Sequence, residues 1–339
     1  MLNNLYLQGY KCFVEDYFQM KHLTLLSGLN SSGKSSFLQA IRLLHDRKKL
    51  DGLGTGKDIV SDLTKSCHIG CNDIGNREFA VQMFWQRNDP LPVFTQTSTV
   101  PFCDAFAYVS AARLGPELEL PLRQTEMVSS VGERGAEVLE FIELYSELTG
   151  VPDSLCATEE SKGLLRNISS WLELVSPGIT FDYQTIPDMD RARATFANRR
   201  PTNVGFGLAY TLPIIANVLA WATLVSNGKI ASPLLLLENP EAHLHPRGQT
   251  QMGKFLATAA SEGVQIVLET HSDHLLNGIR LAVREGILSC EDSSFYFFRY
   301  DPTETKTIVE EPILDERGYF DDWPDGFFDE TERVLAQLF

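Results

Sequence analysis

The spacing of apolar and polar residues predicts alternating strands and helices along most of the chain. Apolar residues alternate with polar ones around residues 5–7, and the apolar run 23–26 ends at a glycine, so both segments are expected to be β-strands. From residue 34 to residue 44, apolar side chains recur at helical spacing. Residues 23–44 are therefore predicted to run strand, glycine-rich loop, helix.

The rest of the chain continues this α/β pattern. Further strands are expected at 79–85, 105–109, 179–183, 234–237 and 264–268, and helices at 133–148, 162–175, 206–228, 248–260 and after Ser272. The strands 234–237 and 264–268 are apolar apart from Gln265, which is typical of buried parallel strands between helices. Residues 47–75 are expected to form a loop excursion, and the tail from Ser293 a small β-rich appendage.

The overall charge limits the classes of partner. The chain has 339 residues with 29 Lys and Arg against 45 Asp and Glu, a net charge of −16. Such a protein repels phosphate backbones on average, so coating of nucleic acid over a whole face is disfavoured. One basic stretch, RARATFANRR, departs from this balance through Arg191, Arg193, Arg199 and Arg200. It is either a solvated loop or a contact for nucleic acid or an acidic partner.

Targeting and membrane signals are weak. The six cysteines include a single C-x3-C pair, Cys67 and Cys71, so reduced thiols are expected rather than a zinc site. The N-terminus lacks a basic start followed by a long apolar run, which predicts a cytoplasmic protein. The uncharged segment 206–228 is long enough to span a bilayer, but it contains Pro213 and Asn217 and is expected to be a buried core helix.

The strongest motif is GLNSSGKSS, residues 28–36, here called the phosphate loop. It fits G-x-x-x-x-G-K-[ST] between an expected strand and helix. Glycines let backbone N–H groups turn inward around phosphate oxygens, and a helix N-terminus adds positive potential. Lys34 is expected to reach the outer phosphates and Ser35 to ligate Mg²⁺. The candidate ATP-binding residues are Gly28, Asn30, Ser31, Ser32, Gly33, Lys34, Ser35 and Ser36.

A candidate metal-binding acid follows the apolar strand in PLLLLENPEAHLHP. Four leucines precede Glu238, whose carboxylate is expected to hold Mg²⁺ directly or through water. Glu241 is the nearest further carboxylate that could orient a water molecule. A solvated acidic turn after a core strand is the alternative.

Two interpretations compete for the acid- and histidine-rich segments near the ends of the last two strands. The residues concerned are His243, His245, Glu269, His271, Asp273 and His274. They are numerous enough to suggest a metal-dependent hydrolase, although a metal site also needs ligands that converge from elsewhere. Alternatively, a single histidine after strand 264–268 contacts a γ-phosphate, and His271 fits that position.

These segments, in this order, resemble an ABC-type ATPase head of the SMC, RecF and overcoming-lysogenisation-defect (OLD-like) group within the AAA family. The opening LYLQGYKCF is similar to the group's first strand and turn, GLNSSGKSSFLQAIRLL to its Walker A loop and helix, ENPEAHLHP to its Walker B end and D-loop, and ETHSD to its switch-histidine loop. The segments YVSAARLGP and VGERGAEVLEF and the ending WPDGFFDE resemble a subset that carries an uncharacterised C-terminal domain. The resemblance implies a P-loop NTPase with an ATPase head at 1–290, a helical lobe at about 125–205 and a small C-terminal domain at 291–339.

The same resemblance implies a site shared between two copies of the chain. NVGFG is similar to a degenerate signature loop, in which Asn203, Gly205 and Gly207 would meet ATP held by the other subunit of a homodimer. A glycine turn before a core helix is the alternative. His271 would sense the γ-phosphate.

One position departs from the group. Its members commonly carry two adjacent acids after this strand, whereas Asn239 follows Glu238 here. An amide cannot accept a proton, and loss of a general base typically costs about 10²- to 10⁴-fold in rate. ATP hydrolysis is therefore expected to be slow or to depend on Glu241, with Lys34 and His271 as the other catalytic residues.

Three functions are compatible with the sequence. The first is an ATP-driven switch that dimerises around ATP and controls a separately encoded effector, such as a nuclease, in prokaryotic anti-phage defence. The second is a RecF-like DNA-repair or chromosome-maintenance ATPase that clamps DNA. The third is a metal-dependent hydrolase for which ATP is only regulatory.

Overall fold

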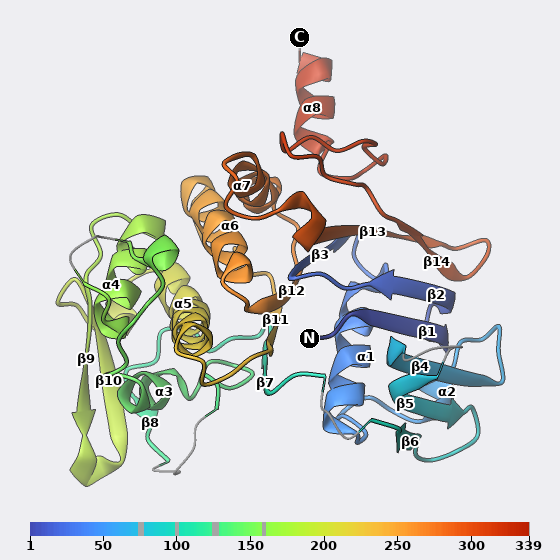
Figure 1. The fold of residues 1–339 in the computed structure, drawn as a ribbon, viewed down its shortest axis with the longest axis horizontal. Helices are drawn as coiled ribbons and strands as arrows, with labels where there is room; N and C mark the ends of the chain where they lie inside the picture. Colours follow the sequence, from blue (N-terminus) through green and yellow to red (C-terminus); the bar gives the residue numbers. More distant parts are fainter. Residues whose placement is uncertain (74–77, 99–101, 124–128, 158–160, 339) are drawn as a thin grey trace. The chain divides into compact units, whose positions relative to one another are not determined.

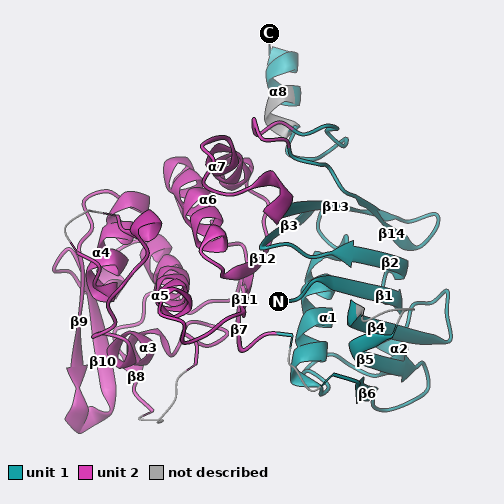
Figure 2. Cartoon of the chain, in the orientation of Figure 1, with its two compact units in different colours: residues 1–102, 293–314, 320–339 teal, residues 103–292, 315–319 magenta. Residues whose placement is uncertain are grey.

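The computed structural model describes residues 1–339 apart from 74–77, 99–101, 124–128, 158–160 and 339. The chain forms two compact units, drawn in teal and magenta in Figure 2. The first comprises residues 1–102, 293–314 and 320–339, and the second comprises residues 103–292 and 315–319. The expected domain boundary between residues 290 and 291 stays a prediction, and the predicted lobe at 125–205 begins outside the described residues.

The first unit contains an antiparallel sheet and a second set of strands that leads into the phosphate loop (Figure 1). The antiparallel sheet has the order β2 (Phe13–Gln19), β1 (Asn4–Tyr10), β4 (Ser66–Asp73), β5 (Phe79–Gln86) and β6 (Val93–Gln96). In the second set, β3 (Leu23–Gly28) pairs in parallel with β13 (Ser293–Asp301), which pairs antiparallel with β14 (Lys306–Glu310). Helices α1 (Lys34–Asp46), α2 (Gly56–Ile59) and α8 (Glu330–Leu338) complete the unit.

Helix α1 forms where the helical spacing predicts it. It buries the side chains Phe37, Leu38, Ile41 and Leu44 on one face. The ring of Phe37 lies edge-on to Phe18 of β2, with 4.8 Å between ring centroids. This packing fixes the start of the helix, and with it the loop that precedes it.

The second unit is built on three parallel strands that end at the same edge. β7 (Ala105–Val109) and β12 (Gln265–Glu269) flank β11 (Pro233–Glu238), and the register pairs Leu237 with Val109 and Glu238 with Glu269. Helices α6 (Pro246–Ser261) and α7 (Asp273–Arg284) pack closely together, because Gly253 and Gly278 leave no room for a side chain between their backbones.

The same unit contains a helical lobe with a small antiparallel sheet. The sheet has β10 (Arg191–Phe196) between β8 (Leu120–Pro121) and β9 (Phe181–Ile186). The helices are α3 (Val138–Leu144), α4 (Leu164–Val175) and α5 (Phe206–Ser226), and short 3-10 turns lie at Asp153–Leu155, Pro187–Met189, Pro201–Asn203 and Cys290–Asp292.

Helix α5 is a core helix, as the sequence predicts. Among the described residues it is the one helix whose length and hydropathy would allow it to cross a membrane, but 78% of that window is buried inside the protein. Length and composition alone are therefore weak support for a membrane span here.

Three expectations from the sequence are corrected. Residues 47–75 are not only loop, because they contain α2 and β4. The helix expected at 133–148 is reduced to α3, since Gly132 and Gly135 adopt positive φ angles and hold turns ahead of residue 138. The first strand of the tail is not a separate appendage, because β13 lies in the same sheet as β3.

Candidate functional site

The phosphate loop is folded around its own lysine. Gly28 and Gly33 have φ angles of 138° and 113°, and Ser31 has a φ of 63°, so the loop turns through left-handed conformations that favour glycine. The Lys34 side chain is only 4% exposed, and its Nζ donates hydrogen bonds to the carbonyl oxygens of Gly28 (2.9 Å) and Leu29 (2.8 Å). The ammonium group is thus held against the inner surface of the loop.

Strand β14 of the antiparallel pair β13–β14 contacts the phosphate loop through Thr307. The Thr307 hydroxyl donates a hydrogen bond of 2.7 Å to the carbonyl oxygen of Ser32, and the Thr307 N–H bonds to the carbonyl of Cys12. A Cβ atom at Gly33 would lie 2.9 Å from Cys12 Sγ and 3.2 Å from Thr307 Oγ1. Sequence reasoning missed Thr307, which carries no motif and lies 275 residues from Ser32.

The phosphate loop has unsatisfied polar capacity that fits a phosphate group. The Ser32 hydroxyl is buried and makes no hydrogen bond to any described residue. Gly33 N-caps α1 without a side-chain hydrogen bond to the helix, and Ser35 in the first turn is exposed. A helix N-terminus with these groups is suited to bind phosphate oxygens.

The second unit places Glu238 at the carboxyl edge of its parallel strands. Its Oε2 accepts a hydrogen bond of 2.9 Å from the N–H of Ala111, which follows β7. The side chain is half-buried. An oriented carboxylate at a strand end is a suitable ligand for Mg²⁺.

A buried arginine that sequence reasoning missed supports the same strand end. Arg113 is 2% exposed and donates hydrogen bonds to the carbonyl oxygens of Glu238 (2.9 Å) and Asn239 (2.6 Å). Its guanidinium carbon lies 5.1 Å from the centre of the Tyr210 ring. Burial lowers the pKa of Arg113 to about 10, against the opposing effect of Glu241, so it stays charged at neutral pH. The only signal in the sequence was a basic residue shortly after strand 105–109.

Glu241 is a buried carboxyl group with one open oxygen. It is 7% exposed; Oε1 accepts a hydrogen bond of 3.2 Å from the N–H of His271, and Oε2 makes none to a described residue. Burial raises the pKa of Glu241, while the hydrogen bond from the His271 N–H acts in the opposite direction. The residue before the turn, Asn239, has a φ of 43°, a conformation that asparagine tolerates better than most residues.

The loop that carries His271 is anchored on both sides. The backbone of His271 bonds to Glu241, and Ser272 caps α7 by accepting a hydrogen bond from the N–H of Leu275. The Ser272 hydroxyl also donates to Oε1 of Gln249 on α6 at 2.6 Å. Glu238, Glu241 and His271 therefore share one edge of the second unit.

The signature loop, residues 203–207, leads into an exposed helix N-terminus. Gly205 caps α5 without a side-chain hydrogen bond, and a Cβ atom there would have no neighbour within 4 Å. A Cβ at Gly207 would lie 2.8 Å from the carbonyl oxygen of His243, so the first turn of α5 packs on the loop after β11. Asn203 is exposed at the end of a 3-10 turn.

Two of the histidines considered as ligands of a metal-dependent hydrolase, His243 and His245, make other contacts. The His243 ring lies 4.7 Å from Tyr210 and 5.5 Å from Phe206, measured between ring centroids. His245 caps α6 through its Nδ1. In the part of the chain that the structure describes, no group of three or more His, Cys, Asp or Glu side chains is arranged to hold a metal ion.

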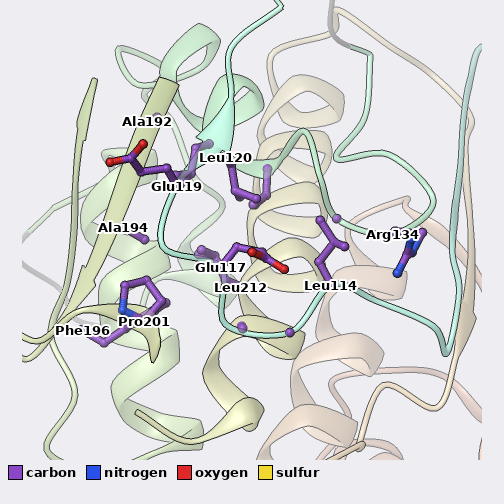
Figure 3. A pocket seen from close by; sticks show the side chains of 15 residues that line it. Leu114, Glu117, Glu119, Leu120, Arg134, Ala192, Ala194, Phe196, Pro201 and Leu212 are labelled. Carbon is purple, nitrogen blue, oxygen red and sulfur yellow. The ribbon is translucent and has the colours of Figure 1, made fainter. Parts of the chain in front are cut away.

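An apolar pocket lies in the lobe beside the signature loop (Figure 3). It encloses about 430 Å³, partly open to solvent, between β10, α3 and the first turns of α5. Its charged lining residues are Glu117, Glu119 and Arg134. With two acids and one base it offers no excess positive charge to a triphosphate.

Comparison with solved structures shows the fold class. The chain is similar to an Smc head domain with an extended coiled coil, bound to the C-terminal domain of ScpA, from Pyrococcus furiosus, at 11% identity and a TM-score of 0.57 over 99% of both chains. It is also similar to an SmcHead bound to the C-winged helix domain of ScpA, at 12% identity and a TM-score of 0.54 over 93% of this chain and 98% of that one. A structure of the recombination mediator protein RecF matches at 13% identity and a TM-score of 0.48, over 92% of this chain and 98% of that one. The two Smc head matches show that the chain has the α/β fold of P-loop NTPases.

Comparison with protein families shows the family. The family described as AAA ATPase domain matches residues 1–98 and 197–276, more than half of the chain, and a family described as a protein of unknown function (DUF3696) matches residues 288–338. No curated protein matches the chain significantly. The chain belongs to the AAA ATPase domain family, and it is a nucleotide-binding ATPase.

Removing the loop lysine tests the nucleotide site. Lys34→Ala should lower ATP affinity by about tenfold to a hundredfold, because backbone amides alone cannot neutralise the triphosphate charge. Calorimetry with the full chain measures the effect, with the exposed Lys229→Ala as the matched control. Unchanged affinity in a folded Lys34→Ala protein would contradict the assignment of the phosphate loop.

Replacing Glu241 tests its burial. The pKa of Glu241 is higher in the folded chain than its ordinary value, because burial disfavours the charged carboxylate. The contribution of this group to the free energy of unfolding is fully present at pH values below the ordinary pKa. It is lost as pH rises through the raised pKa, because the folded chain must then bury a charge. Glu241→Gln should therefore raise the thermal midpoint at pH 7–8, by roughly 2–4 °C per kcal/mol gained, and the gain should shrink toward pH 4.5. The exposed Glu316→Gln is the control. A gain that is the same at both pH values would refute this account.

Proposed function

We propose that the protein is an ATP-driven switch in which two copies close around two ATP molecules. The observation that carries this proposal is the exposed N-terminus of α5, where Gly205 supplies no side-chain cap and an added Cβ atom would have no neighbour within 4 Å. An uncapped end of a 21-residue helix attracts a phosphate group. Asn203, Gly205 and Gly207 would meet the γ-phosphate held by the phosphate loop of the second copy.

Ser35 and Glu238 are the proposed Mg²⁺ ligands. Ser35 is an exposed residue in the first turn of α1, and the carboxylate of Glu238 is oriented by the Ala111 N–H. Mg²⁺, when bound, neutralises charge on the triphosphate. The phosphate-loop residues Gly28, Asn30, Ser31, Ser32, Gly33, Lys34 and Ser36 are proposed to bind the phosphates.

We assign the role of general base to Glu241. Its Oε2 makes no hydrogen bond to any described residue, and its Oε1 is oriented by the backbone of His271, which is proposed to sense the γ-phosphate. Burial raises the pKa of Glu241, which makes the ionised carboxylate a stronger proton acceptor. Turnover is expected to be slow, because Asn239 occupies the position of a second acid.

The cellular role rests on resemblance. Compact OLD-like relatives suggest a cytoplasmic switch in prokaryotic anti-phage defence that controls a separately encoded effector such as a nuclease. Co-purification of this chain with the product of a neighbouring gene, in the presence and absence of ATP, would test this role. An ATP-independent pattern of partners would count against a switch.

A second candidate is a RecF-like ATPase that clamps DNA. It is favoured by the exposed side chains of Arg191, Arg199 and Arg200 on β10 and the following turn. Arg193 does not join them, because it pairs with Glu119. A salt-dependent DNA shift assay with and without ATP discriminates the two functions.

Blocking the helix N-terminus tests the shared site. A non-hydrolysable ATP analogue should roughly double the mass of the wild-type chain in light scattering. Gly205→Trp should prevent the increase while leaving ATP binding to the monomer intact, because a Cβ atom at residue 205 has no neighbour within 4 Å in its own chain. Ser226→Trp, at the exposed other end of α5, is the control. A mass independent of nucleotide and of Gly205 would overturn the shared-site proposal.

Changing the acids tests the general base. Glu241→Gln should reduce turnover by about 10²-fold or more while preserving ATP affinity and dimer formation, since only proton acceptance is lost. Asn239→Glu and Asn239→Asp should accelerate a slow enzyme, and aspartate better suits the positive φ at this position. Wild-type turnover in Glu241→Gln would remove Glu241 from the mechanism and leave a long-lived ATP-bound switch.

A further inference from the structure

A pocket rich in arginine lies in the second unit, away from the residues assigned above. It is formed by the C-terminal half of α7 and the turn 315–319. Asn277, Arg280 and Arg284 line it from α7, and Arg317 and Tyr319 line it from the turn. The pocket has a cavity volume of about 230 Å³ and is open to solvent on one side.

The turn is held rigidly against the helix. Gly318 has a φ of 79°, and a Cβ atom there would lie 2.8 Å from the carbonyl oxygen of Arg280. Nε of Arg280 donates a hydrogen bond of 2.7 Å to the Gly318 carbonyl oxygen. Oδ1 of Asp315 accepts hydrogen bonds from the N–H groups of Arg317 (2.9 Å) and Tyr319 (2.8 Å), which fixes the shape of the turn. The pocket is therefore built before any ligand arrives.

The charged side chains that line the pocket are arginines, and two of them are exposed to a ligand. Arg284 and Arg317 are exposed, and neither forms an ion pair with a residue that the structure describes. None of the described residues that line the pocket is acidic. Of the carboxylates next to these arginines in the sequence, Glu285 pairs with Lys254 and Asp315 bonds to the backbone of its own turn. Glu316 is exposed but does not line the pocket. In a chain with a net charge of −16, this local excess of positive charge is unusual.

An aromatic ring completes the lining. The Tyr319 side chain is 59% exposed, and it lies in the same pocket as the guanidinium groups. Arginine forks match the geometry of phosphate oxygens, and an exposed aromatic face stacks on nucleobases. A ligand with a phosphate group and a planar base satisfies both features.

We propose that this pocket binds a nucleoside phosphate, with its phosphate on Arg284 and Arg317 and its base against Tyr319. Arg280 positions the turn, and Asn277 accepts a hydrogen bond from Nη1 of Arg280. The ligand is either a free mononucleotide or one nucleotide unit of a single-stranded nucleic acid. The proposal is independent of the ATP switch, because it uses no residue of the phosphate loop or the signature loop.

The test uses two probes on the full chain without ATP. Adenosine monophosphate is measured by calorimetry, and a fluorescent twelve-nucleotide thymidine strand by anisotropy. Arg284→Glu combined with Arg317→Glu should weaken binding by at least about tenfold, and for the strand it should flatten the salt dependence by about 0.7 per lost phosphate contact. Arg284→Lys with Arg317→Lys keeps the charge but not the arginine fork, so it should weaken binding less than the double reversal, which separates charge from misfolding.

Control variants locate the binding. Tyr319→Ala should weaken binding, whereas Tyr319→Phe should not, because only the ring is used. Arg191→Glu with Arg200→Glu, on the other basic segment, and the exposed Lys229→Ala should leave binding unchanged. Binding of either probe with this pattern supports the proposal and identifies the source of the ligand.

Two results would overturn the proposal. The first is absence of binding of both probes, or binding that does not respond to the Arg284 and Arg317 reversals. The second is competition by inorganic phosphate together with no effect of Tyr319→Ala, which would mean that the pocket recognises a phosphate group without a base. Because neither probe is a triphosphate, both results leave the ATP-dependent dimer untouched and separately testable.

Discussion

The burial of the Lys34 ammonium group is the constraint on which the first unit depends. A buried charge must keep hydrogen-bond partners, and Lys34 finds them in the carbonyl oxygens of Gly28 and Leu29. The loop that brings those carbonyls to the lysine has positive φ angles at Gly28 and Gly33, which favour glycine at both positions. A triphosphate that binds this loop therefore competes with backbone carbonyls for an ammonium group that is already desolvated. The free-energy cost of removing water from the Lys34 ammonium group therefore falls on folding and not on nucleotide binding.

The backbone turn at Asn239 explains why Glu241 is buried in the second unit. The chain turns sharply at Asn239, with a positive φ, and Arg113 bonds to the carbonyl oxygens of both residues at this turn. The turn directs the next acid, Glu241, inward to the N–H of His271. A carboxyl group in that position is shielded from water, and its pKa is raised. The cationic Arg113, whose own pKa Glu241 raises, keeps the site from accumulating uncompensated negative charge.

The sequence predicted what depends on short-range pattern. The phosphate loop, the helix after it, the apolar strand before Glu238 and the long helix at 206–226 all follow from local spacing and motif. Residues that act through long-range contacts could not be predicted: Thr307 meets Ser32 across 275 positions, and Arg113 meets Glu238 across 125. Helix α3 is shorter than its apolar pattern indicates, because Gly132 and Gly135 form turns before it. Burial of Glu241 was equally invisible, because a carboxylate three residues after a strand end can face solvent or core.

The C-terminal segment contributes to each unit separately, and this changes how its family match should be interpreted. The match to a family of unknown function begins at residue 288, just before β13, yet β13 is the parallel neighbour of β3 and not a strand of an independent module. Residue 307 fixes the phosphate loop, and the turn 315–319 packs on α7, whose N-terminal cap follows His271 directly. A parallel strand cannot be removed from beside β3 without exposing its row of backbone hydrogen-bonding groups. The C-terminal segment therefore contributes to the packing of the phosphate loop in the first unit and of α7 in the second.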